Sequence, residues 1–212
     1  LKYDNDKLIN DLKELFSGTI KAIMEALDAK DSYTSGRSKR ITYYSIIVAK
    51  QLGLSTIDTG KVELAGMLHD IGMIGVSDEI LYKIDALSQE EYDEIKKHIT
   101  YSVKILEDIK QLKDVVEIIK YHHEKYDGTG YPYGVKGEDI PLGSRIIAVA
   151  DAFDSIISNR IYRNKIELQD ALNEIKKGAL TQFDPVVVKA FEDSFDAISA
   201  AVSESELSSY KD

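Results

Sequence analysis

The sequence contains no cysteine, and this absence limits how the chain can bind a metal ion. Without thiolates, neither a disulfide nor a cysteine-ligated zinc site can form. Any metal ion must therefore be held by histidine and carboxylate side chains. Such ligands favour manganese, iron, magnesium or zinc with open coordination positions over a closed structural zinc site.

An excess of basic residues and a long apolar segment are also missing. There are 27 lysines and arginines against 37 aspartates and glutamates, a formal net charge of −10, which argues against a DNA-binding protein. An anionic substrate would need a local positive charge here, and a bound metal ion would supply one. No apolar run approaches the roughly 20 residues of a membrane-spanning helix, and no signal peptide is visible, so we expect a cytoplasmic domain.

Apolar residues recur at intervals of three and four along most of the chain, which predicts an all-α fold. The first such stripe comprises Leu8, Leu12, Leu15, Phe16, Ile20, Ile23 and Leu27. We predict a helix over residues 1–29, which is either part of the core or a signalling stalk that dimerises. A helical domain would then span residues 30–202, followed by a disordered polar tail over residues 203–212.

One segment interrupts the helical pattern, from Asp127 through Gly130, Tyr131 and Pro132 to Pro141. Glycine and proline at this density predict an exposed loop. Because the segment begins four residues after His123, we expect the loop to lie near the histidines.

Two pairs of adjacent residues contain three of the four histidines. His69 and Asp70 follow an apolar helical segment that Gly72 could close. An imidazole beside a carboxylate that can bridge two cations allows one dipeptide to serve two metal ions. His122 and His123 can reach the same ion only where their helix ends, because neighbouring helix positions point about 100° apart.

Three further residues are ambiguous when taken alone. His98 follows two lysines on a helix that a capping box at Ser88 and Glu91 should open, and a lone histidine there could be structural. Asp151 and Asp154 lie three positions apart on an otherwise apolar helix. A carboxylate on a core-facing stripe is costly unless it is paired or bound to a metal ion, so Asp151 is more informative than most carboxylates of the chain.

The order of these motifs over roughly residues 28–195 resembles that of the HD-GYP family. The residues that carry the resemblance are His69-Asp70, His98, His122-His123, Gly130-Tyr131-Pro132 and Ala150-Asp151-Ala152-Phe153-Asp154. The resemblance implies an all-helical, HD-superfamily domain of a bacterial enzyme that hydrolyses cyclic di-GMP or a related cyclic dinucleotide. It also implies a cluster of Fe or Mn ions that activates a water molecule for attack on phosphorus.

Carried over residue by residue, the resemblance implies two metal positions. One ion would take Asp70, His98, His122 and His123, and the other would take His69, Asp70 and Asp151, so that Asp70 bridges the two ions. His69 and Asp70 would thereby be catalytic. The resemblance places Asp154, Arg160 and Arg163 near the bound nucleotide, although the two arginines could equally form a solvated helix end.

Two residues depart from the family pattern. Arg37 stands where the family has a metal-binding histidine, and a guanidinium offers no lone pair to a metal ion. Met73 replaces a lysine that lies near the substrate phosphate. We therefore expect one or two divalent ions, Fe or Mn, and hypothesise that Arg37 pairs with Asp70 or Asp151 and stands in for the weakened second ion.

Three functions remain open on the sequence. The first is an active cyclic-dinucleotide phosphodiesterase, which retention of the other ligands favours. The second is an inactive relative that senses the nucleotide, and the third is an interaction module. In the family the loop at Gly130, Tyr131 and Pro132 is associated with contacts to diguanylate cyclase (GGDEF) domains. Arg37 and Met73 favour the second and third functions.

Overall fold

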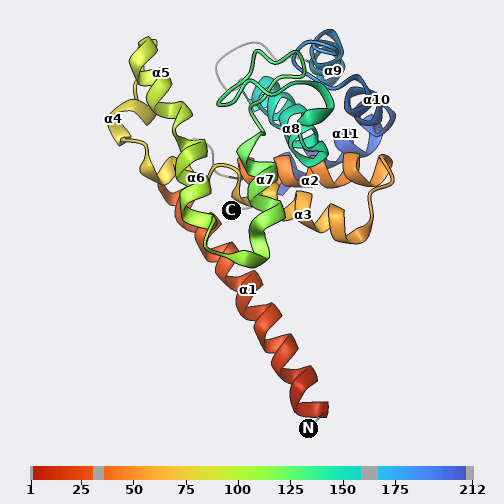
Figure 1. The fold of residues 1–212 in the computed structure, drawn as a ribbon. Helices are drawn as coiled ribbons and strands as arrows, with labels where there is room; N and C mark the ends of the chain where they lie inside the picture. The colour runs from red at the N-terminus through yellow and green to blue at the C-terminus, as the bar shows by residue number, and fades with distance from the viewer. Residues whose placement is uncertain (1, 31–35, 159–166, 209–212) are drawn as a thin grey trace.

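The computed structural model describes residues 2–30, 36–158 and 167–208, and within these ranges the fold is all-α, as predicted (Figure 1). Its helices are α1 (Lys2–Lys30), α2 (Arg37–Gln51), α3 (Thr56–Leu68), α4 (Asp78–Leu81), α5 (Gln89–Lys96), α6 (His98–Leu106), α7 (Lys113–Lys120), α8 (Leu142–Ser158), α9 (Leu168–Lys177), α10 (Pro185–Asp193) and α11 (Phe195–Ser208). Short 3₁₀ turns occur at η1 (Ile71–Gly75), η2 (Lys110–Leu112) and η3 (Gly137–Asp139).

The core lies between α2, α3, α7 and α8, with α10 and α11 closing one side (Figure 1). Three aromatic side chains fill its centre. The ring of Phe153 on α8 meets Tyr44 of α2 and Phe191 of α10 edge to face, with centroid distances of 5.6 and 5.0 Å. Burial of such apolar stripes is the main stabilising contribution in a domain of this size. The core thereby fixes α8, the helix that carries Asp151 and Asp154.

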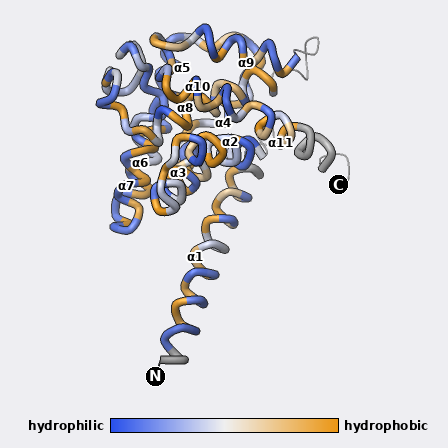
Figure 2. The backbone as a smooth tube through the Cα atoms, turned by 90° about the vertical axis from the view of Figure 1, so that its right-hand side faces the viewer, coloured by the Kyte–Doolittle hydropathy of each residue, from blue (hydrophilic) through white to orange (hydrophobic). Residues whose placement is uncertain are grey.

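Helix α1 extends away from this body, as two perpendicular views of the backbone show (Figures 1 and 2). Its C-terminal half is packed, since Ile20 and Met24 are buried in the core. At its end the Lys30 Nζ donates to the carbonyl oxygens of Ile74 and Val76 at 2.8 and 3.0 Å. The apolar residues of its N-terminal half remain exposed. This half of the helix therefore does not take part in the core of the domain.

The C-terminal end differs from the prediction of a disordered tail from residue 203. Helix α11 continues past the buried Val202 to Ser208, and residues 209–212 lie outside the described ranges. Glu204, Glu206 and Leu207 have favourable helix propensities, so the helix need not end at its last packed residue. None of the helices in the described ranges combines the length and apolar character that a membrane crossing requires.

Candidate metal centre

The histidines lie where helices begin or end. Helix α7 ends at Lys120, so His122 and His123 follow a helix terminus, as the geometric argument required. The capping box at Ser88 and Glu91 is present. However, the helix that it opens, α5, stops at Lys96, and His98 instead begins α6. The prediction that His98 lies on the capped helix is therefore wrong, because that helix is interrupted at Lys97 and a new helix begins at His98.

His69 and Asp70 occupy the turn between α3 and η1. Helix α3 ends at Leu68, yet Gly72 does not close it in the left-handed conformation, since this glycine has no positive φ. Gly72 is instead required for close packing. Its amide donates to Ser102 Oγ on α6 at 2.9 Å, and a Cβ atom would lie 1.9 Å from the carbonyl oxygen of His98. Gly72 thereby holds the segment after Asp70 against the helix that begins with His98.

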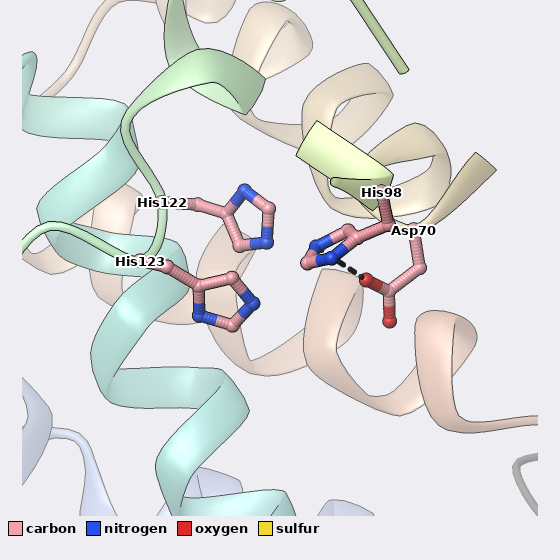
Figure 3. A group of neighbouring side chains, drawn as sticks. All are labelled: Asp70, His98, His122 and His123. Carbon is pink, nitrogen blue, oxygen red and sulfur yellow. Dashed lines mark ion pairs between the residues drawn. The ribbon is translucent and has the colours of Figure 1, made fainter. Parts of the chain in front are cut away.

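Four of the predicted ligands converge on one point. Asp70, His98, His122 and His123 each offer a ligand atom, and these atoms lie within 4.8 Å of one another. Figure 3 shows the His122 and His123 rings pointing across the gap towards His98 and Asp70. Within this group, His98 Nε2 lies 3.5 Å from Asp70 Oδ1. Segments far apart in the sequence thus supply one compact set of nitrogen and oxygen donors.

The imidazole rings of His69, His98 and His122 are oriented alike. The Nδ1 atom of each ring bonds to the backbone carbonyl oxygen three residues earlier, at 2.8, 2.7 and 2.6 Å respectively. A carbonyl can only accept, so each Nδ1 carries the proton. The Nε2 atoms of His98 and His122 are buried and have no hydrogen-bond partner. An Nδ1–H bound to a carbonyl, with a free Nε2 lone pair, is the arrangement found for metal-binding histidines.

The charges in the cluster suit a cation. Burial, together with the neighbouring histidines, lowers the pKa of His122 well below its usual value, and burial lowers the pKa of His123 to about 4. Burial alone would raise the pKa of Asp70, but the histidines around it, His69 first, hold that pKa well below its usual range. At neutral pH two imidazoles are therefore neutral and the carboxylate is ionised. These are the protonation states in which such groups bind metal ions.

His69 lies beside this group, with its Nε2 3.1 Å from Asp70 Oδ2. Burial opposes a charge on this ring, yet the carboxylates of Asp70 and Asp151 raise the pKa of His69 to about 9. The predicted second set of ligands, His69, Asp70 and Asp151, does not form a comparable cluster among the described residues.

Asp151, the remaining predicted ligand, is bound by Arg37. The Arg37 Nη2 donates to Asp151 Oδ1 at 2.6 Å and to Ser155 Oγ at 2.7 Å. The guanidinium thus pairs with Asp151, one of the two partners that the sequence suggested. Met73 is part of η1, and its backbone carbonyl accepts from Lys30 Nζ at 3.4 Å.

Asp154, which the resemblance placed near the bound nucleotide, is held inside the protein by side chains of α2 and α8. Its side chain is completely buried, and Arg40 binds both carboxylate oxygens at 2.7 and 3.0 Å. The Ser158 hydroxyl donates to the same carboxylate. The buried carboxylate of Asp154 is thus paired with the arginines of α2. Arg160 and Arg163 lie outside the described residues.

The loop after the histidine pair is folded back on the site. Tyr131 is half-buried, and its ring stacks on His123 with a centroid distance of 4.9 Å. Glu124 is buried, and its Oε1 accepts from the amides of Tyr133 and Gly134 at 2.7 and 3.1 Å. Pro132 is exposed, as predicted for a partner loop, whereas Tyr131 faces the histidines.

A cleft of about 420 Å³ leads away from the histidine pair. Its lining includes His122, His123, Asp151, Ser155 and Phe183. This volume is within the usual range for small-ligand sites. The cleft therefore borders the candidate metal centre at His122 and His123.

Three residues of this region, Arg40, Glu124 and Ser155, were not predicted from the sequence. Simple spacing could have found two of them. Arg40 follows Arg37 by three positions and Ser155 follows Asp151 by four, so each pair shares a helix face. Glu124 is adjacent to the histidine pair, and its burial could be inferred only from the folded loop.

The comparisons with known proteins agree with this geometry. The HD domain family profile matches residues 21–187. A 3'3'-cGAMP-specific phosphodiesterase of Vibrio cholerae is 39% identical over 78% of this chain and 36% of its own length. A cyclic di-GMP phosphodiesterase of Thermotoga maritima is 38% identical over 76% of this chain and 45% of its own length.

Among solved structures, Bd1817, described as an HDG"Y"P protein from Bdellovibrio bacteriovorus, aligns with a TM-score of 0.63. It is 22% identical, and the alignment covers 88% of this chain and 63% of Bd1817, so this likeness concerns the fold. The chain spans less than half the length of the two curated relatives named above. The family match, the identities to both relatives and the order of the motifs agree, and the chain belongs to the HD domain family, of the HD-GYP type.

Proposed function

We propose that this chain is a metal-dependent phosphodiesterase domain that hydrolyses a cyclic dinucleotide in bacterial second-messenger signalling. The observation that supports it best is the set of buried, unpartnered Nε2 atoms beside an ionised carboxylate. A buried polar atom without a partner is costly, and an ion bound to His98, His122 and Asp70 would remove that cost. The relatives point to the same chemistry, since their names give cyclic di-GMP and 3'3'-cGAMP as substrates.

The four residues Asp70, His98, His122 and His123 would hold the ion. Nitrogen and oxygen donors with no thiolate suit Mn or Fe in an open site, and we propose one of these two metals. When bound, such an ion lowers the pKa of a water molecule and neutralises charge on phosphate oxygens. His69 would orient Asp70 from the side, through the 3.1 Å contact between the two side chains. A second-messenger substrate would place this activity in the cytoplasm.

Hydrolysis should depend on metal. We expect the chain, loaded anaerobically with Mn²⁺ or Fe²⁺, to convert cyclic di-GMP or 3'3'-cGAMP to linear product. Chelation should reduce the rate at least about a thousandfold, because the ion supplies several kcal/mol of transition-state stabilisation. Product formation, followed by chromatography with each nucleotide in turn, measures this.

Re-addition of the metal after chelation is the control, and it should restore the rate. A chain that binds either nucleotide but turns over neither with any metal would instead support the alternative of an inactive sensor. Arg37 and Met73 are the observations that favour that alternative. A GGDEF-domain partner at the exposed Pro132 would remain compatible with both outcomes.

We also propose that α1 pairs with α1 of a second copy. Leu8, Leu12 and Leu15 are 57%, 56% and 67% exposed and lie on one side of a helix that leaves the domain. Apolar residues at this spacing form a seam between two helices. Leu12→Glu with Leu15→Glu should convert a dimer to a monomer in sedimentation experiments, whereas Asn10→Glu on the opposite face should not. A wild-type chain that sediments as a monomer at high concentration would exclude this pairing.

A further inference from the structure

The guanidinium of Arg37 lies where a second cation was expected. It donates to Asp151 at 2.6 Å and to Ser155 at 2.7 Å, and its Nη1 lies 3.4 Å from Asp154 Oδ2. The Arg37 side chain is only 19% exposed, so these contacts are largely shielded from solvent. The guanidinium of Arg37 therefore supplies a positive charge next to Asp151.

This contact decides what Asp151 can do. Its Oδ1 atom already accepts a charge-assisted hydrogen bond from Arg37 at 2.6 Å. A divalent ion at Asp151 would also lie beside a fixed positive charge, which repels it. In keeping with this, the group of ligand atoms found among the described residues includes Asp70 and three histidines but not Asp151.

The arginine is held in this position by a second pair. Arg40, one turn further along α2, binds both oxygens of the buried Asp154. Asp154 therefore engages Arg40 more closely than Arg37, at 2.7 Å against 3.4 Å. Arg37 therefore makes its shortest carboxylate contact with Asp151. Burial opposes its charge, but Asp151, Asp70 and Asp154 together raise the pKa of Arg37 above its usual value, so the charge persists at any physiological pH.

We propose that this centre holds a single divalent ion, bound by Asp70, His98, His122 and His123, and that the Arg37 guanidinium permanently replaces a second cation. This inference rests on the proposed function and specifies its metal content. A guanidinium binds phosphate oxygens well but cannot ligate or activate a water molecule as a metal ion does. Asp151 then acts as a positioning residue for Arg37.

Metal stoichiometry tests this inference without any activity measurement. The purified chain is loaded with Mn²⁺, freed of excess metal and analysed by elemental analysis and by electron paramagnetic resonance. We expect one Mn²⁺ per wild-type chain, with the spectrum of an isolated ion. Arg37→His removes the guanidinium and supplies a ligand beside Asp151, and it should raise the content to two ions with the spectrum of a spin-coupled pair.

Arg37→Lys is the matched control, because it changes the same position but keeps a positive charge beside Asp151 and supplies no ligand. It should leave the content at one ion. Two ions in the wild-type chain, or one ion in folded Arg37→His, would overturn the inference. Should Arg37→His not fold, Asp151→Asn gives a second test, because loss of the single ion from that variant would show that Asp151 is a ligand. No bound ion in the wild-type chain would instead contradict the proposed function itself.

Discussion

Replacing Asp70 with asparagine is expected to abolish turnover, with a loss of about a thousandfold or more in kcat. Asp70 is the only carboxylate among the four converging ligand atoms. Asparagine has nearly the same shape but no negative charge, so the variant keeps the packing and loses the charged ligand. The histidines around Asp70 hold its pKa well below the usual range, which means that the charge is present throughout the working pH range of the wild-type chain.

Metal content and hydrolysis should be measured together on Asp70→Asn, since loss of the ion should accompany loss of activity. Asp114→Asn is a suitable control because that carboxylate is exposed on α7, away from the centre. It should retain both metal and turnover. Normal metal content and normal turnover in Asp70→Asn would show that the four residues are not the ligand set.

Gly72→Ala should be strongly destabilising. The added Cβ would lie 1.9 Å from the His98 carbonyl oxygen and 2.6 Å from the Ser102 amide nitrogen. Both neighbours belong to the backbone of α6, so relief requires η1 and α6 to move apart. Overpacking of this kind costs about 3 kcal/mol or more, and we expect a fall of that size in the free energy of unfolding, measured by denaturant titration.

Gly60→Ala on α3 is the matched control. No atom lies within 4 Å of a Cβ added at that position, so the helix should gain about 0.5–1 kcal/mol. Gly72→Ala should also weaken metal binding, because it separates Asp70 from His98. A variant as stable as the wild type would mean that the close packing of η1 on α6 is not needed for folding.

The sequence could predict the features that depend on neighbouring residues. The helical periodicity gave the all-α fold, and the geometry of adjacent helix positions indicated that His122 and His123 must follow a helix end. The cost of a carboxylate on an apolar stripe indicated that Asp151 needs a partner. These arguments use only local spacing and the chemistry of single side chains.

Features that depend on distant segments were not accessible in the same way. The sequence left two partners open for Arg37, and only the packing of α2 on α8 shows that it binds Asp151. The role of Gly72 depends on the backbone of α6, thirty residues later. The composition of the loop that contains Tyr131 predicts exposure. Its ring nevertheless stacks on His123, and the buried Glu124 accepts a hydrogen bond from the backbone amide of Tyr133 in the same loop.

The attachment of Lys30 to η1 has a mechanical consequence. The last residue of α1 is tied to the carbonyl oxygens of Ile74 and Val76, and η1 begins directly after Asp70. A twist or shift of α1 would thus be transmitted to Asp70, and with it the geometry of the four donors would change. Such coupling is reciprocal. If a position of α1 favours binding of the ion, then binding of the ion favours that position of α1 by the same free energy.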